Sequence, residues 1–311
     1  MIHIHNGEVT ASLARRSGVA GEHLSFRESL VAGPVPEGVD VETRARFLAE
    51  AHGQNLLRVR NDLLAQEAAL DAAKQEDEVV LWFEHDLYCL VHLLAMLERF
   101  AEHPRLSLVF VREPLGLSDP LAFGTLFDSR AAVTPAMLSL GRAAWRAYTA
   151  PDPAGLNELL AGELADFPFL REGLLLHASR FPSTRNGLGE LENRAINLIA
   201  TGSSDFSTLF GRLDAEHPRF GFGDSEVLRD LREIAWCAVP LITITEAEDK
   251  SPPKALLALT PAAMNVIDGS VDNLALNDPD FWLGGVHVTK ENVWRWDDAR
   301  RQILPSRPAG S

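Results

Sequence analysis

The chain has 311 residues, and its 46% of hydrophobic and 23% of charged residues are typical of a globular protein of about two domains. With 29 Lys and Arg against 44 Asp and Glu, its formal net charge of -15 opposes attraction to phosphate backbones, which argues against nucleic acid as a general partner. No apolar run is long enough to cross a membrane, so we expect no membrane partner.

The first residues and the cysteines bear on the cellular compartment. Residues 2–6 have the alternation of a strand and lack the basic and apolar regions of a secretory signal. Cys89 and Cys237 lie far apart in apolar helical patterns, where a free thiol packs as a small hydrophobe. We therefore expect this acidic protein in a reducing cytoplasm.

Residues 1–118 predict an α/β domain, because strand-like apolar runs alternate with helical patterns. The run at residues 79–83 is apolar throughout, as in a strand covered on both faces. We expect a Rossmann-like, mostly parallel sheet whose strands end at one common edge. The expected strands are residues 2–6, 23–28, 79–83 and 106–111, and the expected helices are residues 8–16, 43–73 and 87–100.

Residues 119–185 carry mainly helical patterns and predict a helical bridge, which ends in the turn-forming residues 180–187. Residues 186–311 predict a winged-helix-like domain, because three short helices precede two strands around a charged, Pro-containing loop. The helices are expected at 190–200, 206–213 and 225–236, the strands at 241–245 and 255–259, and a terminal hairpin at 284–288 and 293–297.

The strongest candidate for chemistry is the run Glu84-His85-Asp86, which directly follows a buried-type strand and precedes a helix. Ligands of open α/β sheets bind beyond the carboxyl ends of the strands, where a helix N-terminus favours an anion. A histidine at this place can act as acid or base near neutral pH. The alternative is that Asp86 only caps the helix while Glu84 and His85 are solvated.

Two other strand ends should meet this run. Asn6-Gly7 gives a turn that permits close backbone approach to a ligand, although a plain turn explains it as well. Arg27-Glu28 supplies a cation and a carboxylate, which a simple salt bridge also explains.

These strand ends predict one small-molecule cleft for an anionic or nucleotide-like ligand. In this hypothesis His85 is the acid or base, and Asp86 or Glu28 orients it. Arg27 holds the anion, and the turn at Asn6 supplies backbone donors. The expected catalytic residues are His85, Asp86 and Glu28, and the expected ligand-binding residues are Asn6, Gly7, Arg27, Glu84 and Tyr88.

No standard cofactor motif identifies the ligand. The chain has no G-x-G-x-x-G, no phosphate-binding P-loop, no G-x-S-x-G and no H-E-x-x-H, so the cofactor stays unknown. His3 and His5 share one face of a strand, but no third ligand has standard spacing, so we expect packed histidines and no metal site.

The winged-helix-like domain raises the question of DNA. Its third helix is mainly acidic, so we expect a structural or protein-interaction role instead. The charged residues of this helix are Asp224, Glu226, Arg229, Asp230, Arg232 and Glu233.

Several segments together resemble the bacterial family known as domain of unknown function 1835, over the first third to half of the chain. They are residues 2–7, Arg27-Glu28 with Gly33-Pro34, and residues 83–88; Leu259-Thr260 and the Trp-rich segments 282–287 and 294–297 are also similar. Glutamine is frequent in that family where Leu90 stands here. The resemblance implies no activity, substrate or catalytic residue.

Two further functions remain open beside the ligand cleft. One is a regulatory or adaptor protein, for instance one linked to transcription, that acts through the winged-helix-like domain, for which Trp294 and Trp296 are candidate contacts. The other is sequence-specific DNA binding, which steeply salt-dependent affinity would reveal. The polar residues at the strand ends favour the cleft.

Overall fold

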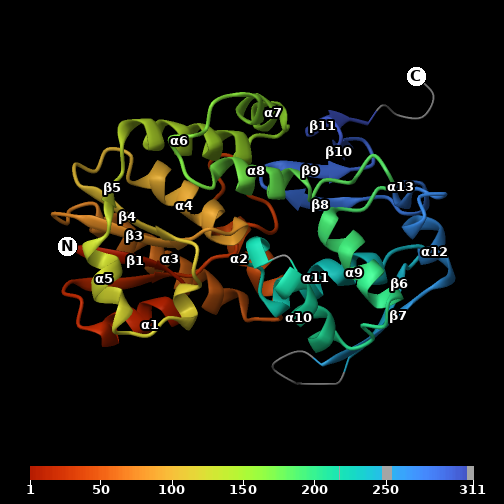
Figure 1. Cartoon of the computed structure of the whole chain (residues 1–311), viewed down its shortest axis with the longest axis horizontal. Helices are drawn as coiled ribbons and strands as arrows, with labels where there is room; N and C mark the ends of the chain where they lie inside the picture. Colours follow the sequence, from red (N-terminus) through yellow and green to blue (C-terminus); the bar gives the residue numbers. More distant parts are fainter. Residues whose placement is uncertain (217, 247–253, 307–311) are drawn as a thin grey trace.

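The computed structural model describes residues 1–216, 218–246 and 254–306. The N-terminal part is α/β, with a five-stranded sheet in the order β2-β1-β3-β4-β5 (Figure 1). β1 to β4 pair in parallel, and the short β5 is antiparallel to β4, so the expected mostly parallel sheet is confirmed. The strands are β1 (Ile2–Asn6), β2 (Glu22–Phe26), β3 (Val79–Glu84), β4 (Leu106–Val111) and β5 (Ala131–Ala132).

Helices cover both faces of this sheet. Successive side chains of a strand point to opposite faces, so neighbouring residues pack against different helices. Trp82 packs in a cluster with Ala14 of α1, whereas Phe83 belongs to the cluster that contains Leu94 of α4. The helical region expected at 43–73 is two helices, separated by a turn in which Gly53 has a φ of 59°. The helices are α1 (Glu8–Ser17), α2 (Val41–Ala51), α3 (Leu56–Ala73), α4 (Leu87–Arg99), the 3-10 turn η1 (Leu115–Leu117) and α5 (Ala122–Asp128).

The strand order contains a switch point between β1 and β3. From β1 the chain passes through α1 to β2, and it then returns through α2 and α3 to β3 on the other side of β1. Leu70 of α3 packs in the cluster of Phe83, on the face opposite to α1. The connections therefore leave β1 and β3 in opposite directions, and such a crevice is where open α/β sheets bind ligands.

The middle of the chain is helical, as expected. These helices lie beside α4 along one side of the molecule (Figure 1), and α6 packs on α4 with Gly141 against Leu97. They are α6 (Pro135–Thr149), α7 (Ala154–Ala161) and α8 (Leu170–Ala178).

The C-terminal part has three helices followed by a two-stranded hairpin, in the expected order. The charged loop that joins the two strands, residues 247–253, lies outside the described residues. The elements are α9 (Glu190–Ala200), α10 (Phe206–Glu216), the 3-10 turn η2 (Pro218–Phe220), α11 (Asp224–Ala235), β6 (Ile242–Glu246), β7 (Ala255–Leu259), α12 (Pro261–Ile267) and α13 (Asn273–Leu276).

The pairing expected for the terminal hairpin is wrong. Gly284 and Gly285 form a turn rather than a strand, and Gly284 has a φ of 64° and lies against the backbone of Tyr148. β8 therefore pairs with β9, and β10 pairs with β11, so two small hairpins replace one. The strands are β8 (Asp280–Leu283), β9 (Val286–Thr289), β10 (Trp294–Asp297) and β11 (Gln302–Pro305).

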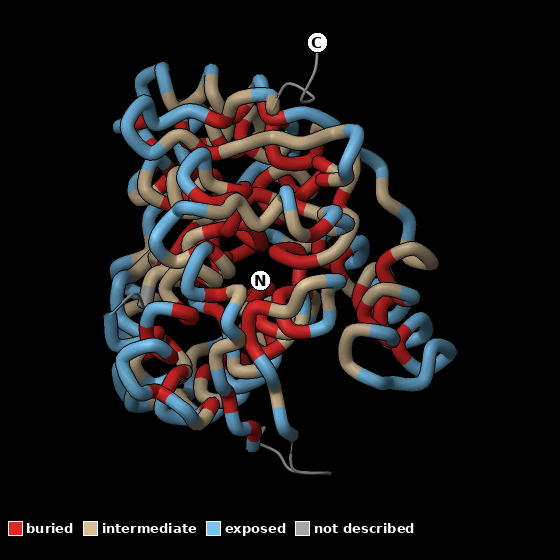
Figure 2. The backbone as a smooth tube through the Cα atoms, turned by 90° about the vertical axis from the view of Figure 1, so that its right-hand side faces the viewer, coloured by how far each residue is buried: buried red, intermediate tan, exposed pale blue. Residues whose placement is uncertain are grey.

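One hydrophobic cluster runs from Ile2 to Ile303 and joins the N-terminal sheet to the C-terminal helices. Figure 2 shows that the buried segments concentrate inside the molecule, while the outer turns are exposed. Hydrogen bonds also cross between the parts, from Val35 N to the Gly284 carbonyl at 2.9 Å and from the Tyr148 hydroxyl to the Leu30 carbonyl at 2.7 Å. Among the described residues, no helix combines the length and apolar character that a membrane span needs.

Candidate functional site

Asn6 and Glu84 end β1 and β3, so both lie at the switch point. A chain of hydrogen bonds fixes the orientation of Asn6. The Leu30 N–H donates to His92 Nε2 at 3.1 Å, so the other ring nitrogen, Nδ1, carries the proton and donates to Asn6 Oδ1 at 2.7 Å. The amide group of Asn6 then directs Nδ2 at Cys89 Sγ, 2.8 Å away. Sγ is therefore held as a hydrogen-bond acceptor.

Glu84 turns its side chain toward the face covered by α1 and η1. Its Oε1 accepts the N–H of Leu115 at 3.0 Å. Burial raises the pKa of this carboxyl above its usual value, against the lowering effect of the amides of Leu115 and Gly116.

Asp86 is the N-cap of α4, and its Oδ1 accepts the N–H of Cys89 at 2.7 Å. The capping role of Asp86 in the alternative interpretation is therefore confirmed, whereas Glu84 and His85 are half-buried rather than solvated. Gly221, which follows η2, packs on its carboxylate so closely that a Cβ at Gly221 would collide with it. Burial, aided by the charge of Glu84, raises the pKa of Asp86 to about 7.

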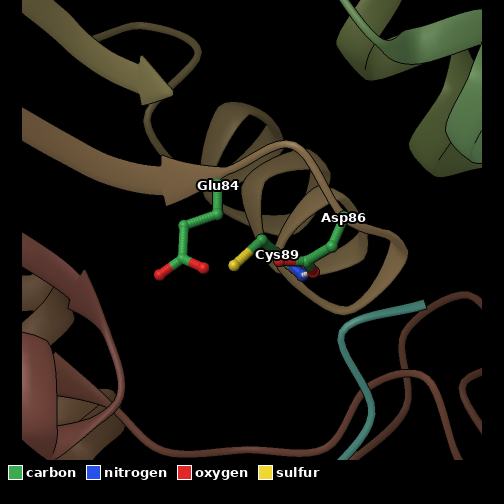
Figure 3. Close-up of side chains that lie close together, drawn as sticks. All are labelled: Glu84, Asp86 and Cys89. Atoms are coloured by element: carbon green, nitrogen blue, oxygen red, sulfur yellow. Dashed lines mark hydrogen bonds between the residues drawn. The ribbon is translucent and has the colours of Figure 1, made fainter. Parts of the chain in front are cut away.

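Glu84, Asp86 and Cys89 bring their side chains together at one strand-to-helix corner (Figure 3). One carboxylate oxygen from each acid and the sulfur lie within 4.8 Å of one another. Burial and the charges of Asp86 and Glu84 raise the pKa of the Cys89 thiol well above its usual value. This corner gathers potential metal ligands in a place largely removed from water, where burial favours their uncharged forms.

The N-terminus of α1 opens beside this corner. Gly7 is its N-cap with a φ of 91°. Among the described residues, no side chain caps the helix, and no atom beyond the chain neighbours of Gly7 lies within 4 Å of the place where a Cβ of Gly7 would stand. A positive φ and an empty approach are conditions that glycine meets without strain. The N-terminus of α1 is therefore uncapped, and its first two residues, Glu8 and Val9, are exposed.

His85 points away from this corner, because successive residues at the end of β3 face opposite sides of the sheet. Its ring lies 4.1 Å from that of Phe110 and stacks on Phe169 with centroids 5.4 Å apart. Both ring nitrogens are buried without a hydrogen-bond partner among the described residues, and burial lowers the pKa of the ring. The expected pairing of His85 with Asp86 is not formed.

Glu28 is held in a buried ion pair rather than in the cleft. Its carboxylate binds Arg44 of α2, with Oε1 2.6 Å from Nη2, and the two side chains are 7% and 4% exposed. Arg44 also donates to the carbonyl groups of Ser29, Ala32 and Pro34. The pair therefore fixes the loop after β2, and the roles expected of Glu28 in catalysis and orientation lose their basis.

The other two predicted residues divide between surface and interior. Arg27 is exposed directly after β2. The pKa of Glu8, the first residue of α1, is lowered mainly by its hydrogen bond with Arg15, and the charge of Arg27 makes a smaller contribution, so Arg27 lies near the N-terminus of that helix. Tyr88 donates its hydroxyl to the Glu28 carbonyl at 2.6 Å and is engaged in holding the same loop.

His3 and His5 are fully buried and packed, as expected for histidines of a covered strand. Trp82 Nε1 donates to His3 Nδ1 at 3.1 Å, and His5 Nε2 lies 2.9 Å from His23 Nδ1. Burial lowers the pKa of His3 to about 4 and that of His5 to about 2, so both rings are neutral at pH 7.

Two hollows lie away from the switch point. One is among α9, α10 and α11, next to Gly221, and the other is at the amino-terminal edge of β3 and β4, around Glu78. Arg130 and Arg105 neutralise Glu78 with contacts of 3.0 and 3.3 Å. Among the described residues, neither hollow brings three potential metal ligands together as the corner of Glu84, Asp86 and Cys89 does.

The fold and this corner define an open α/β protein with a polar site at its switch point. In comparisons with known proteins, no family model matches the chain, and no curated protein matches it. The resemblance to domain of unknown function 1835 therefore stays a prediction.

Sequence reasoning missed Cys89 and His92 as members of the site. Both lie in an apolar helical run, in which Cys89 was expected to pack as a small hydrophobe and His92 was not singled out. The available signal was spacing, because Cys89 is three residues after the N-cap Asp86, at the first turn of α4, and His92 follows one turn later.

Proposed function

We propose that the β1/β3 edge binds a small anionic ligand, such as a phosphate-bearing or nucleotide-like molecule. The observation that carries this proposal is the open, uncapped N-terminus of α1 at Gly7, beside the polar corner of the switch point. Free N–H groups and the helix dipole favour an anion at such a place.

The surroundings of α1 support a ligand with a charged and an apolar part. Arg27 adds a positive charge on the β2 side. On the η1 side, Val9 and Leu117 are 64% and 87% exposed, and Val9 lies next to Gly116. Small-molecule sites combine a few polar anchors with apolar walls, so these side chains suit the body of the ligand.

A thermal-shift screen of inorganic phosphate, nucleotides, sugar phosphates and carboxylates tests the proposal. We expect at least one class to raise the Tm, since a ligand at a hundred times its Kd stabilises the folded state by about 2.7 kcal/mol. Arg27→Ala should weaken this shift, whereas Arg16→Ala, an exposed arginine in the last turn of the same helix, should leave it unchanged. No shift across the panel, or equal loss in both variants, would refute the proposal.

The adaptor function is the second candidate. Trp236, at the end of α11, is 68% exposed and favours it. Trp296 is buried and Trp294 half-buried, however, so these two are poor contacts for a partner. Glu226 of α11 is buried near Ser29, so this helix is also poorly placed to enter a DNA groove.

Four further predictions are also proposals. The first is membership of the family domain of unknown function 1835, the second is a cytoplasmic location, and the third is the division into parts at residues 1–118, 119–185 and 186–311. The winged-helix-like character of the last part belongs with them, and it is supported by the order of three helices and a hairpin.

A further inference from the structure

We propose that Glu84, Asp86 and Cys89 bind a divalent cation of the zinc type. A role for this ion in ligand binding rests on the proposed function, because the ion would lie at the same edge as the anionic ligand. Binding of the ion itself does not depend on that function. Neither the sequence motifs nor the spacing of the histidines points to this site.

The donor set selects the kind of metal. Two carboxylates and a thiolate suit zinc or cobalt, whereas magnesium and calcium take oxygen ligands only. The three ligand atoms already lie within 4.8 Å of one another. Zinc bonds of about 2.0 to 2.3 Å require donors about 3 to 4 Å apart, so the donors have to move closer together by only about 1 to 2 Å when the ion binds.

The charge of the corner is a second and independent observation. Glu28 and Glu78, two other buried carboxylates of the sheet region, each have an arginine partner. Glu84 and Asp86 form no ion pair with Arg or Lys among the described residues, although Asp86 is only 8% exposed. A buried carboxylate without a counter-charge is costly, and a bound cation would supply that charge.

The hydrogen bond at the sulfur fits a metal-bound thiolate. Because His92 fixes the orientation of Asn6, the amide N–H of Asn6 is directed at Cys89 Sγ and not its oxygen. Groups that donate to or orient a metal ligand are a regular feature of metal sites. Three protein ligands leave a fourth position for water or for the anionic ligand, as in catalytic zinc sites.

The experiment titrates the full-length protein, stripped with a chelator at pH 8, with zinc alone and with cobalt alone. We expect one tight equivalent, and with cobalt the near-ultraviolet absorption of a thiolate bond. Cys89→Ser should abolish this absorption, and Cys237→Ser, which removes the other free thiol, should retain it. Glu84→Gln, a substitution of equal size at a half-buried position, should weaken zinc binding by at least about tenfold.

Three outcomes would overturn the proposal: no stoichiometric binding to the wild type, cobalt–thiolate absorption that survives in Cys89→Ser, or zinc affinity unchanged in Glu84→Gln. If Cys89→Ser does not fold, the Glu84→Gln and Cys237→Ser proteins decide. No anion is present in this titration, so its failure is separate from that of the anion screen. A protein that binds zinc but no anion would keep this proposal and lose the proposed function.

Discussion

At the residue scale, the site depends on which way a few side chains face. The proton on Nδ1 of His92 determines the orientation of Asn6, and Asn6 in turn determines that Cys89 Sγ is an acceptor. Glu84 and His85 are neighbours, yet they face opposite sides of the sheet, so only Glu84 joins the site. Adjacent polar residues in a sequence are thus not necessarily one functional unit.

Buried neutral histidines should make stability depend on pH. His177 is enclosed by Tyr148 and Phe181, both of its ring nitrogens lack a partner among the described residues, and burial lowers its pKa from 6.5 to about 3. Below pH 6.5, His177 binds a proton in the unfolded chain but not in the folded protein. The free energy of unfolding therefore decreases as the pH falls below 6.5.

We therefore expect His177→Leu to flatten the pH dependence of the free energy of unfolding. The variant should recover about 2 kcal/mol between pH 6.5 and pH 5, since each pH unit contributes about 1.4 kcal/mol for one such group. Urea denaturation of both proteins at pH 8 and pH 5 measures the difference. If the substitution changes the free energy of unfolding by the same amount at both pH values, protonation of His177 does not cause the pH dependence.

At the element scale, the elements of the sheet were predictable and its contacts were not. Continuous apolar runs such as residues 79–83 and the Asp86 cap have local signals, so β3 and the start of α4 were expected correctly. The partner of Glu28 is Arg44, on a helix that a loop brings back over the strand end, and no local pattern indicates such a pair. The hairpin of β8 and β9 was missed because Gly284 and Gly285 were assigned to a strand.

The contact between η2 and α4 covers Asp86, and glycine is required there. We expect Gly221→Ala to destabilise the protein twice over, because its φ of 66° strains an alanine and its Cβ would meet the Asp86 carboxylate. The strain costs about 1 to 2 kcal/mol, and the collision costs about 1 to 3 kcal/mol more.

Gly53→Ala is the matched control for this prediction. Gly53 has a similar φ of 59° but no atom within 4 Å of its Cβ position, so only the strain applies. Chemical denaturation of the two variants isolates the contact. If both lose the same stability, the packing of Gly221 on Asp86 contributes nothing.

At the scale of the whole molecule, the three parts of the chain share one core. The cluster that includes Ile2 also includes Leu174 of the helical middle and Ile303 near the end of the described residues. Arg180 Nη1 donates to the Val31 carbonyl at 2.8 Å, which ties the segment after α8 to the loop after β2. The composition predicted enough apolar residues for two cores, but it carries no information on whether those cores merge.

A shared core predicts cooperative unfolding. We expect one calorimetric transition for the full chain, because separation of the C-terminal helices would expose apolar surface that the sheet region also buries. Differential scanning calorimetry at neutral pH checks this. Two resolved transitions would mean that the proposed parts are independent domains.

A crystal structure of the protein with zinc and phosphate, recorded at the zinc absorption edge, tests directly whether the switch point is a ligand site. We predict an anomalous peak bounded by Glu84, Asp86 and Cys89, and phosphate density at the N-terminus of α1 beside Gly7. Zinc could instead occupy another place, for example the exposed pair His287 and Asp280. Full occupancy of that pair with an empty β1/β3 edge would contradict a ligand site at the switch point.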